Sequence, residues 1–170
     1  MTSFDCCGVR TTDSIPLTGA DASFAVVGDD SLLYVIAAGD AGRANGKLSI
    51  VDPVTRTEVA VLNGLGERPG AMAFHPTGSR LLIASRTEGI LEVNTSIRAI
   101  TRGPGNGVKP GGHGVEGLAI DLRGRVYAVD PDRCGVPGVV HVLTAPPDYS
   151  EIKTVLVGNC PTTAAVAVTQ

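Results

Sequence analysis

The hydrophobic residues of this chain fall in short runs that are separated by polar turns. Six such runs are rich in Val, Ile, Leu and Ala and are bounded by Gly, Pro, Asn or Asp: residues 24–27, 32–37, 48–51, 59–62, 81–84 and 126–129. Runs of this length and composition between turn formers are typical of β-strands. Asn45-Gly46 lies between two of them, and this dipeptide is the strongest short hairpin signal. The pattern therefore predicts an all-β chain.

Residues 90–102 are open to two interpretations. Four apolar residues lie there at helical spacing: Ile90, Val93, Ile97 and Ile100. The same stretch also forms two short strands about a turn at residues 94–96. We favour the two strands, because the segments before and after follow that plan.

The same plan recurs three times along the chain. Each copy has an apolar strand, a polar turn with Gly or Asp and a second apolar strand, in residues 23–37, 71–85 and 117–130. Equivalent residues lie 49 and 46 positions apart, and a matching hairpin follows each copy, in residues 48–64, 90–103 and 139–158. Four strands in such a period are typical of a β-propeller blade. Residues 163–168 repeat the first strand once more.

The first hairpin, together with the second copy that follows it, resembles a known propeller repeat. Residues 50–85 resemble the YVTN-type repeat through Ile50, Asp52, Thr55, Val59, Val61, Gly64, Pro69, Pro76, Gly78, Leu81 and Leu82. Residues 114–130 are similar to repeats of NHL and gluconolactonase-like propellers. The resemblance covers about residues 22–168 and implies the fold without choosing a function, because lactonases, lyases, surface-layer proteins and scaffolds share such repeats. Thr77 departs from the Pro-Asp-Gly turn of the repeat, and aromatic residues are few, at 4%.

The number of repeats does not decide whether the propeller forms a closed ring. The sequence predicts about three full four-stranded antiparallel blades plus end strands, which make either a partial ring or a small closed propeller. We take residues 1–21 as an N-terminal segment that offers outer strands for a closing blade, and residues 22–170 as the propeller repeat domain. Closure then has two routes. Residues 2–17 and 163–168 build a fourth blade, or two chains form one ring of about six to eight blades. We prefer the homodimer.

Composition excludes several classes of protein. Of the 170 residues, 43% are hydrophobic and 18% are charged, which argues against a disordered chain. The net charge of -3 argues against a nucleic-acid or anionic-membrane partner. No apolar run reaches the roughly 18 residues that a membrane span needs. The N-terminus has neither a basic region nor an apolar core of a secretory signal, which favours a cytoplasmic location unless a leader has been removed.

Most unusual polar residues fall in loops that a propeller places on one face. These are the loops between blades and the loops between the second and third strands, where propeller ligands usually bind. The candidate ligand-binding residues are Glu67, Arg68, Arg86, His113, Glu116, Asp130 and Asp132. The alternative interpretation is that these loops are polar only because water solvates them.

A metal site is a narrower hypothesis. His113, Glu116, Asp130 and Asp132 offer oxygen ligands and one imidazole, a set that suits a divalent cation such as calcium. The gluconolactonase-like resemblance implies that a Glu before Gly, here Glu116, helps to bind a metal that polarises a lactone carbonyl. We therefore assign Glu116 and Asp130 as the metal candidates, while a plain binding module needs no cofactor. The comparable position in the second blade, Pro69-Gly70, lacks the Asn of that family, and this departure weakens the assignment.

The remaining candidates concern histidine and cysteine. His75 is expected in a solvated turn, and His141 is expected to point away from the core. Cysteines occur at positions 6, 7, 134 and 160 without a C-x-x-C pair, which argues against structural zinc. Cys134 and Cys160 fall in loops on the same face, so they either form a disulfide, which would imply an oxidising compartment, or stay as free thiols. We favour free thiols.

Three classes of function remain. The first is a binding or interaction module that uses the loops of one face, with a protein or small-molecule partner. The second is a metal-dependent lactonase-like hydrolase or lyase that uses His113, Glu116 and Asp130. The third is a structural fragment that completes a propeller ring by self-association. We rank them in this order, because the sequence contains no established catalytic motif.

Overall fold

The computed structural model describes residues 3–4, 10–11 and 14–166 and contains three four-stranded antiparallel sheets in chain order. Blade 1 comprises β3 (Ala22–Val27), β4 (Leu33–Ala37), β5 (Lys47–Asp52) and β6 (Thr57–Asn63). Blade 2 comprises β7 (Pro69–Phe74), β8 (Arg80–Ser85), β9 (Gly89–Asn94) and β10 (Ala99–Arg102). Blade 3 comprises β11 (Gly117–Ile120), β12 (Val126–Asp130), β13 (Pro137–Leu143) and β14 (Glu151–Asn159). Within the described residues, the only helical element is a 3-10 turn at Pro110–Gly112.

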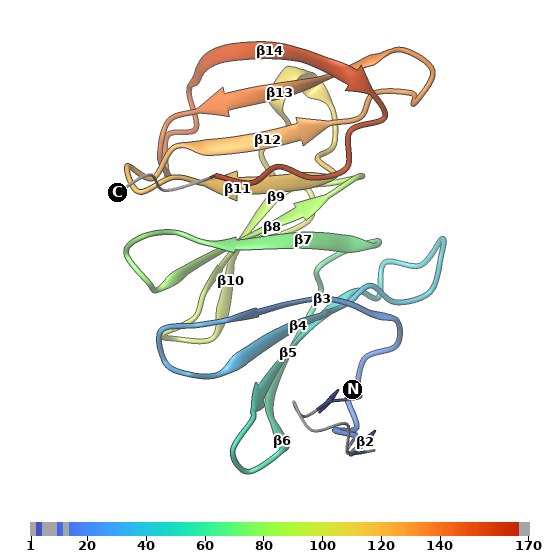
Figure 1. Cartoon of the computed structure of the whole chain (residues 1–170), viewed down its shortest axis with the longest axis vertical. Coiled ribbons are helices and arrows are strands. Elements are labelled where there is room, and N and C mark those ends of the chain that lie inside the picture. Colours follow the sequence, from blue (N-terminus) through green and yellow to red (C-terminus); the bar gives the residue numbers. More distant parts are fainter. Residues whose placement is uncertain (1–2, 5–9, 12–13, 167–170) are drawn as a thin grey trace.

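The three sheets spread from their first strands like the blades of a propeller. Strand β7 packs against β3 on one side and against β11 on the other. In Figure 1 the outer strands β6 and β14 lie at opposite ends of the view, and blade 2 lies between them. The chain is therefore an all-β partial propeller of three blades, as the sequence predicts. No helix among the described residues is long and apolar enough to cross a membrane.

The core lies between neighbouring blades. Tyr34, Ile36 and Ile50 of blade 1 pack with Leu81 and Ile83 of blade 2. The alternate residues of β8, Leu82 and Ala84, face blade 3 and pack with Val126 and Ala128. Blade 2 is thus covered on both faces, which explains why residues 81–84 read as an unbroken apolar run and not as an alternating one. Each fully buried Leu or Ile contributes roughly 1.5–3 kcal/mol to folding.

Except at the ends of the chain, the strand predictions are confirmed, including the two strands expected in residues 90–102. Residues 90–102 form β9 and β10 with a turn between them, because Ile90 and Val93 are buried against opposite neighbouring blades. The hairpin signal at Asn45-Gly46 needs a correction, since β4 and β5 are joined by residues 38–46. Asn45 donates to Asp40 across this longer loop, and the Gly46 N–H donates to Gly66 O at 2.8 Å.

The end segments differ from the predicted closing strands. Strands β1 (Ser3–Phe4) and β2 (Arg10–Thr11) pair only with each other in the described part of the chain. The prediction of a strand at residues 163–168 is wrong for residues 163–166, which form no strand, while 167–168 lie outside the described residues. Backbone atoms of Thr162 and Thr163 nevertheless lie against Gly117 of β11, so the segment runs where a next inner strand would begin. At the other end, Thr18 donates from its backbone and hydroxyl to Glu58.

Candidate functional site

The loops of one face bring the predicted site residues into two adjoining cavities. A pocket of about 300 Å³ is lined by Glu67, Arg68, Arg86 and Glu116 together with Phe24 of β3. A second pocket of about 310 Å³ is lined by Arg86, His113, Asp130 and Asp132. Arg86 lines both cavities. We call the first the axial pocket and the second the blade 3 pocket.

Each of these residues lies at the end of a strand or in the loop next to it. Glu67 and Arg68 come from the loop between β6 and β7, and Arg86 begins the turn after β8. His113 and Glu116 belong to the long loop before β11, and Asp130 ends β12. Because first strands start and second strands end at the same edge of each sheet, these residues meet although they are far apart in the sequence.

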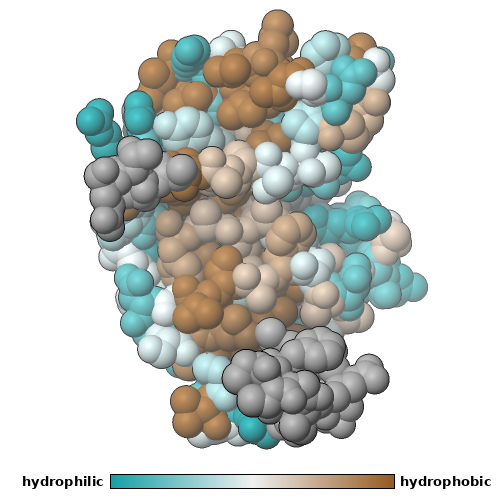
Figure 2. Space-filling model, viewed as in Figure 1, coloured by the Kyte–Doolittle hydropathy of each residue, from teal (hydrophilic) through white to brown (hydrophobic). Residues whose placement is uncertain are grey.

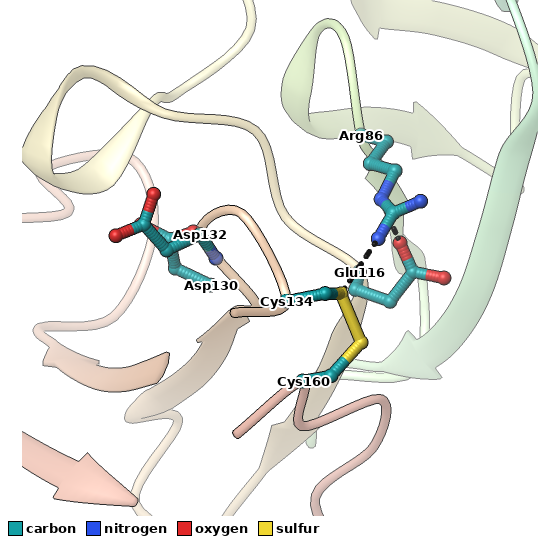
Figure 3. Close-up of a disulfide and its surroundings, with 6 residues drawn as sticks. All are labelled: Arg86, Glu116, Asp130, Asp132, Cys134 and Cys160. Atoms are coloured by element: carbon teal, nitrogen blue, oxygen red, sulfur yellow. Dashed lines mark hydrogen bonds and ion pairs between the residues drawn. A yellow bond between two sulfur atoms is a disulfide. The ribbon is translucent and has the colours of Figure 1, made fainter. Parts of the chain in front are cut away.

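Arg86 is the residue that links the two pockets. Its Nε lies 2.8 Å from Glu116 Oε2, and its terminal nitrogen donates to Cys134 Sγ at 3.7 Å (Figure 3). The Arg86 and Glu116 side chains are 55% and 32% exposed, so solvent screens the ion pair and its contribution to stability stays below about 1 kcal/mol. The pair therefore orients the guanidinium more than it stabilises the fold.

Cys134 and Cys160 form a disulfide, and the preference for free thiols is wrong. Their Cα atoms are 4.2 Å apart and they are separated by 26 positions in the sequence. The bridge joins the loop after β12 to the segment after β14 (Figure 3), so blade-edge loops that the sequence places on one face do lie in contact. Cys6 and Cys7 lie outside the described residues.

In the blade 3 pocket, a buried carboxylate orients a histidine. The side chain of Asp130 is 6% exposed, and its Oδ2 lies 2.8 Å from Nδ1 of His113, whose side chain is 59% exposed. The backbone N–H of Asp132 donates to the other oxygen, Asp130 Oδ1, at 2.8 Å. This arrangement holds one imidazole nitrogen of His113 and leaves Nε2 available to a ligand.

A second histidine, His141, lies next to this pair on the buried side. The sequence predicts that its side chain points away from the core, and this prediction is wrong. His141 is buried, its Nδ1 lies 2.6 Å from Glu151 Oε2, and its Nε2 lies 3.9 Å from Asp130 Oδ2. Its position follows from β13, where His141 and Leu143 alternate on the side that faces blade 2. His75, by contrast, is half-buried in its turn and hydrogen-bonds to Thr77 at 3.0 Å, and burial lowers the pKa of its imidazole.

The two metal candidates have separate partners. Glu116 pairs with Arg86, and Asp130 pairs with His113. Among residues 3–4, 10–11 and 14–166, no group of three or more His, Cys, Asp or Glu side chains is placed to hold a metal ion. A metal at Glu116 would share that carboxylate with the Arg86 guanidinium.

A buried charge cluster was not found by sequence reasoning. Glu92 of β9 is 5% exposed and lies 3.2 Å from Arg80 and 3.1 Å from Arg102, and it accepts a 2.7 Å hydrogen bond from the Tyr149 hydroxyl. Burial and the neighbouring Glu92 raise the pKa of Tyr149 above its usual range. The only signal in the sequence is a charge inside the apolar run of residues 90–93. The cluster ties blade 2 to the β13–β14 turn and lines neither pocket.

Comparisons with known proteins identify the fold and no family. A scan against protein-family models gave no match, and a search of curated proteins gave none. Among solved structures, the chain is similar to a protein from Lactobacillus plantarum (TM-score 0.62, 18% identity, 91% of this chain and 50% of that one). It is also similar to the WD40 repeats of RRP9 (TM-score 0.61, 18% identity, 89% and 43%). A third similar structure is hydrazine synthase of Kuenenia stuttgartiensis (TM-score 0.61, 15% identity, 79% and 36%).

These likenesses support a β-propeller and leave the YVTN and NHL resemblance unconfirmed. A β-propeller domain of Cps50 from Myceliophteria thermophila also matches, with a TM-score of 0.51 and 14% identity. At such low identity the likeness concerns the fold alone. The chain spans half or less of each of these structures, between 36% and 50%.

Proposed function

We propose that this chain is a protein-binding module whose ligand is a peptide segment of a partner, docked on the loop face at the axial pocket. The observation that supports this most is the composition of that pocket. Phe24 offers an aromatic surface that is 46% exposed, at the place where the inner strand of blade 1 meets loops of blades 2 and 3. A cavity of about 300 Å³ accommodates one or two anchoring side chains.

The charges of the pocket favour an acidic anchor beside an apolar one. The carboxylate of Glu67 accepts the Gly42 N–H at 3.0 Å, and Glu116 is paired with Arg86. Arg68 has no hydrogen bond or ion pair with any other described side chain. Its backbone has a positive φ of 46°, which is costly for a residue with a side chain and is often found at binding sites. Arg68 is therefore the cation available to a carboxylate of the ligand.

A peptide library displayed on phage and panned on the purified protein tests this proposal. We expect enriched peptides to carry Asp or Glu next to an apolar residue, and Arg68→Glu to weaken their binding at least about tenfold. Arg123→Glu is the matched control, because Arg123 lies in the β11–β12 turn at the opposite ends of the strands. Enriched peptides without an acidic residue, or an equal loss in both variants, would contradict the proposal.

Ester or lactone hydrolysis is the second candidate function, and the His113–Asp130 pair favours it. A carboxylate 2.8 Å from Nδ1 is the arrangement that orients an imidazole as a general base. The metal-dependent version would place a divalent cation such as calcium at Glu116 and Asp130. A chromogenic ester and a lactone, each with and without added calcium, test both versions. Turnover should fall at least about a hundredfold in His113→Gln. A wild-type rate no higher than that of free imidazole would reject this function.

Self-association concerns the open faces of blades 1 and 3. The outward face of blade 1 carries a groove of about 480 Å³ lined by Leu33, Val35 and Val51 together with Ile15 and Leu17, and Val35 and Val51 are themselves buried. Figure 2 shows hydrophobic surface over blade 3 and again over blade 1 on the side that faces the viewer. The occupant that fits is a second copy, because the two open faces are the two halves of one blade-to-blade contact and three blades are half of a six-bladed ring.

A further inference from the structure

We propose that the Cys134–Cys160 disulfide is a thiol-exchange site that reacts with a low-molecular-weight thiol of the glutathione class, with Cys134 as the leaving group. The inference goes beyond the binding function and does not depend on it. It rests on the exposure of the bridge, on its contact with Arg86, and on the difference between its two sulfur atoms.

The bridge is open to solvent. Cys134 is exposed in the loop between β12 and β13, and Cys160 is half-buried in the segment after β14. Exposed disulfides are the labile and regulatory ones, whereas structural bridges resist reduction. A small thiol therefore reaches this bridge without unfolding of a blade.

The two sulfur atoms have different surroundings. A guanidinium nitrogen of Arg86 donates to Cys134 Sγ at 3.7 Å (Figure 3). No described cation makes such a contact with Cys160. A neighbouring guanidinium lowers the pKa of a thiol and stabilises its thiolate, and a thiolate of lower pKa leaves faster. The contact therefore directs attack to Cys160 Sγ and makes Cys134 the departing sulfur.

The exchange balances in two steps. The attacking thiolate forms a bond to Cys160 Sγ, the bond between the two cysteines breaks, and its electron pair stays on Cys134 Sγ. A second thiolate then attacks the external sulfur of the mixed disulfide, and Cys160 leaves and takes a proton from solvent. Two external thiols are oxidised to one disulfide, and the protein gains two electrons.

The reaction also changes the candidate binding site. Arg86 donates to Glu116 through Nε and to Cys134 through a terminal nitrogen, so a thiolate at Cys134 places a second negative charge on the same guanidinium. Reduction also releases the link that holds the segment after Cys160, whose next residues lie against Gly117 of β11. The redox state of the bridge is thereby coupled to the charge of the axial pocket.

Reaction with glutathione tests the proposal. The protein carries Cys6→Ser and Cys7→Ser, so that Cys134 and Cys160 are its only cysteines. Acid quenching and peptide mass spectrometry should locate the first glutathione adduct on Cys160. Arg86→Gln should slow the reaction about three- to tenfold. Arg133→Gln is the matched control. It removes a positive charge from the loop between β12 and β13, which contains Cys134, but Arg133 has no described contact with either sulfur. The rate of this variant should stay near that of wild type.

A second variant keeps the test decisive if Arg86→Gln folds poorly. Glu116→Gln keeps an oxygen that can accept from Arg86 Nε but removes a negative charge beside the Cys134 thiolate, and it should therefore raise the rate. Three results would overturn the proposal: a first adduct mainly on Cys134, equal rates in the Arg86 and Arg133 variants, or no reaction before the whole chain unfolds, as followed by circular dichroism.

Discussion

At the scale of single residues, Glu92 is a buried charge whose partners come from two blades. Its carboxylate is surrounded by the guanidinium groups of Arg80 and Arg102 and by the Tyr149 hydroxyl, and the Arg102 guanidinium lies 5.5 Å from the centre of the Tyr149 ring. Removal of one partner from such a buried cluster leaves the other charges without compensation. The cluster thus makes blade 2 and the β13–β14 turn depend on each other.

We expect Glu92→Ala to lower the free energy of unfolding by about 3–5 kcal/mol, because two partly buried arginines lose their counter-charge. Tyr149→Phe should cost only about 1 kcal/mol, since it removes one hydrogen bond and keeps the ring. Urea unfolding followed by circular dichroism measures both variants. A cost for Glu92→Ala no larger than that for Tyr149→Phe would show that the cluster contributes little.

Asp121 makes part of the stability depend on pH. Burial alone would raise the pKa of this carboxyl, but the Arg125 side chain at 2.7 Å and the backbone N–H groups of Arg123 and Arg125 outweigh it, so the pKa is lowered. The stabilisation is present above the unfolded value of about 4 and is lost as the pH falls through the lowered pKa. Between roughly pH 5 and pH 3, wild type should therefore lose more of its free energy of unfolding than Asp121→Asn does. Urea unfolding of both proteins at each pH measures the two losses. Equal losses would refute this.

The sequence predicted on which face the site residues lie better than it predicted which residues they contact. Loop positions follow from strand periodicity, so Arg86 and Glu116 were expected on one face. Phe24 and His141 were missed, because their exposure and burial are set by contacts with other strands and blades. Whether Cys134 bonds to Cys160 likewise depends on a distance across the fold that spacing along the chain does not give.

At the scale of elements, the long loop before β11 fits closely against the turn after β8. A Cβ at Gly114 would lie 1.7 Å from the Arg86 carbonyl oxygen, a contact with backbone that no rotamer change relieves. Gly114 therefore lets His113 and Glu116 approach Arg86.

We expect Gly114→Ala to destabilise the protein by about 3 kcal/mol, because the loop must move away from the backbone of Arg86. Gly158→Ala is the control, since nothing lies within 4 Å of a Cβ there, and it should change stability by less than about 0.5 kcal/mol. Thermal unfolding of both variants provides the comparison. A Gly114→Ala protein as stable as the control would mean that the loop is free to shift.

Strands β4, β5, β8 and β9 were predictable because they bury side chains on both faces, so their apolar residues form short runs that end at polar turns. Turns were less predictable. Asn45-Gly46 indicated a tight hairpin, but the Asn45 side chain bonds with Asp40 within a longer loop. The expected strand at residues 163–168 failed over 163–166 for a different reason. An apolar pattern becomes a strand only where neighbouring strands complete its hydrogen bonds on the sheet.

At the scale of the whole molecule, the repeat predicts blades but not the closure of a ring. Each blade contacts only its neighbours, so the sequence of one blade carries no information on what packs against the first and the last. The homodimer remains a prediction.

We expect native mass spectrometry to detect a species of roughly twice the 17.4 kDa chain, because a second copy buries both open faces. Val155→Glu should shift the population to monomer. Val155 pairs with Val140, on the side of blade 3 that faces away from blade 2, and is 39% exposed. Val54→Glu, in the β5–β6 turn at 88% exposure, should leave the mass unchanged. A monomer at all concentrations would exclude ring closure by a second copy.

The sulfur bridge has a mechanical consequence for blade 3. Tension applied to the two ends of the chain passes from Cys134 to Cys160 directly, so the outer hairpin of β13 and β14 carries no load while the bridge is intact. The 26 residues of this loop correspond to roughly 90 Å of extended chain. Stretched to its limit, the oxidised molecule is shorter than the reduced one by about that length, and its outermost hairpin is shielded from pulling forces.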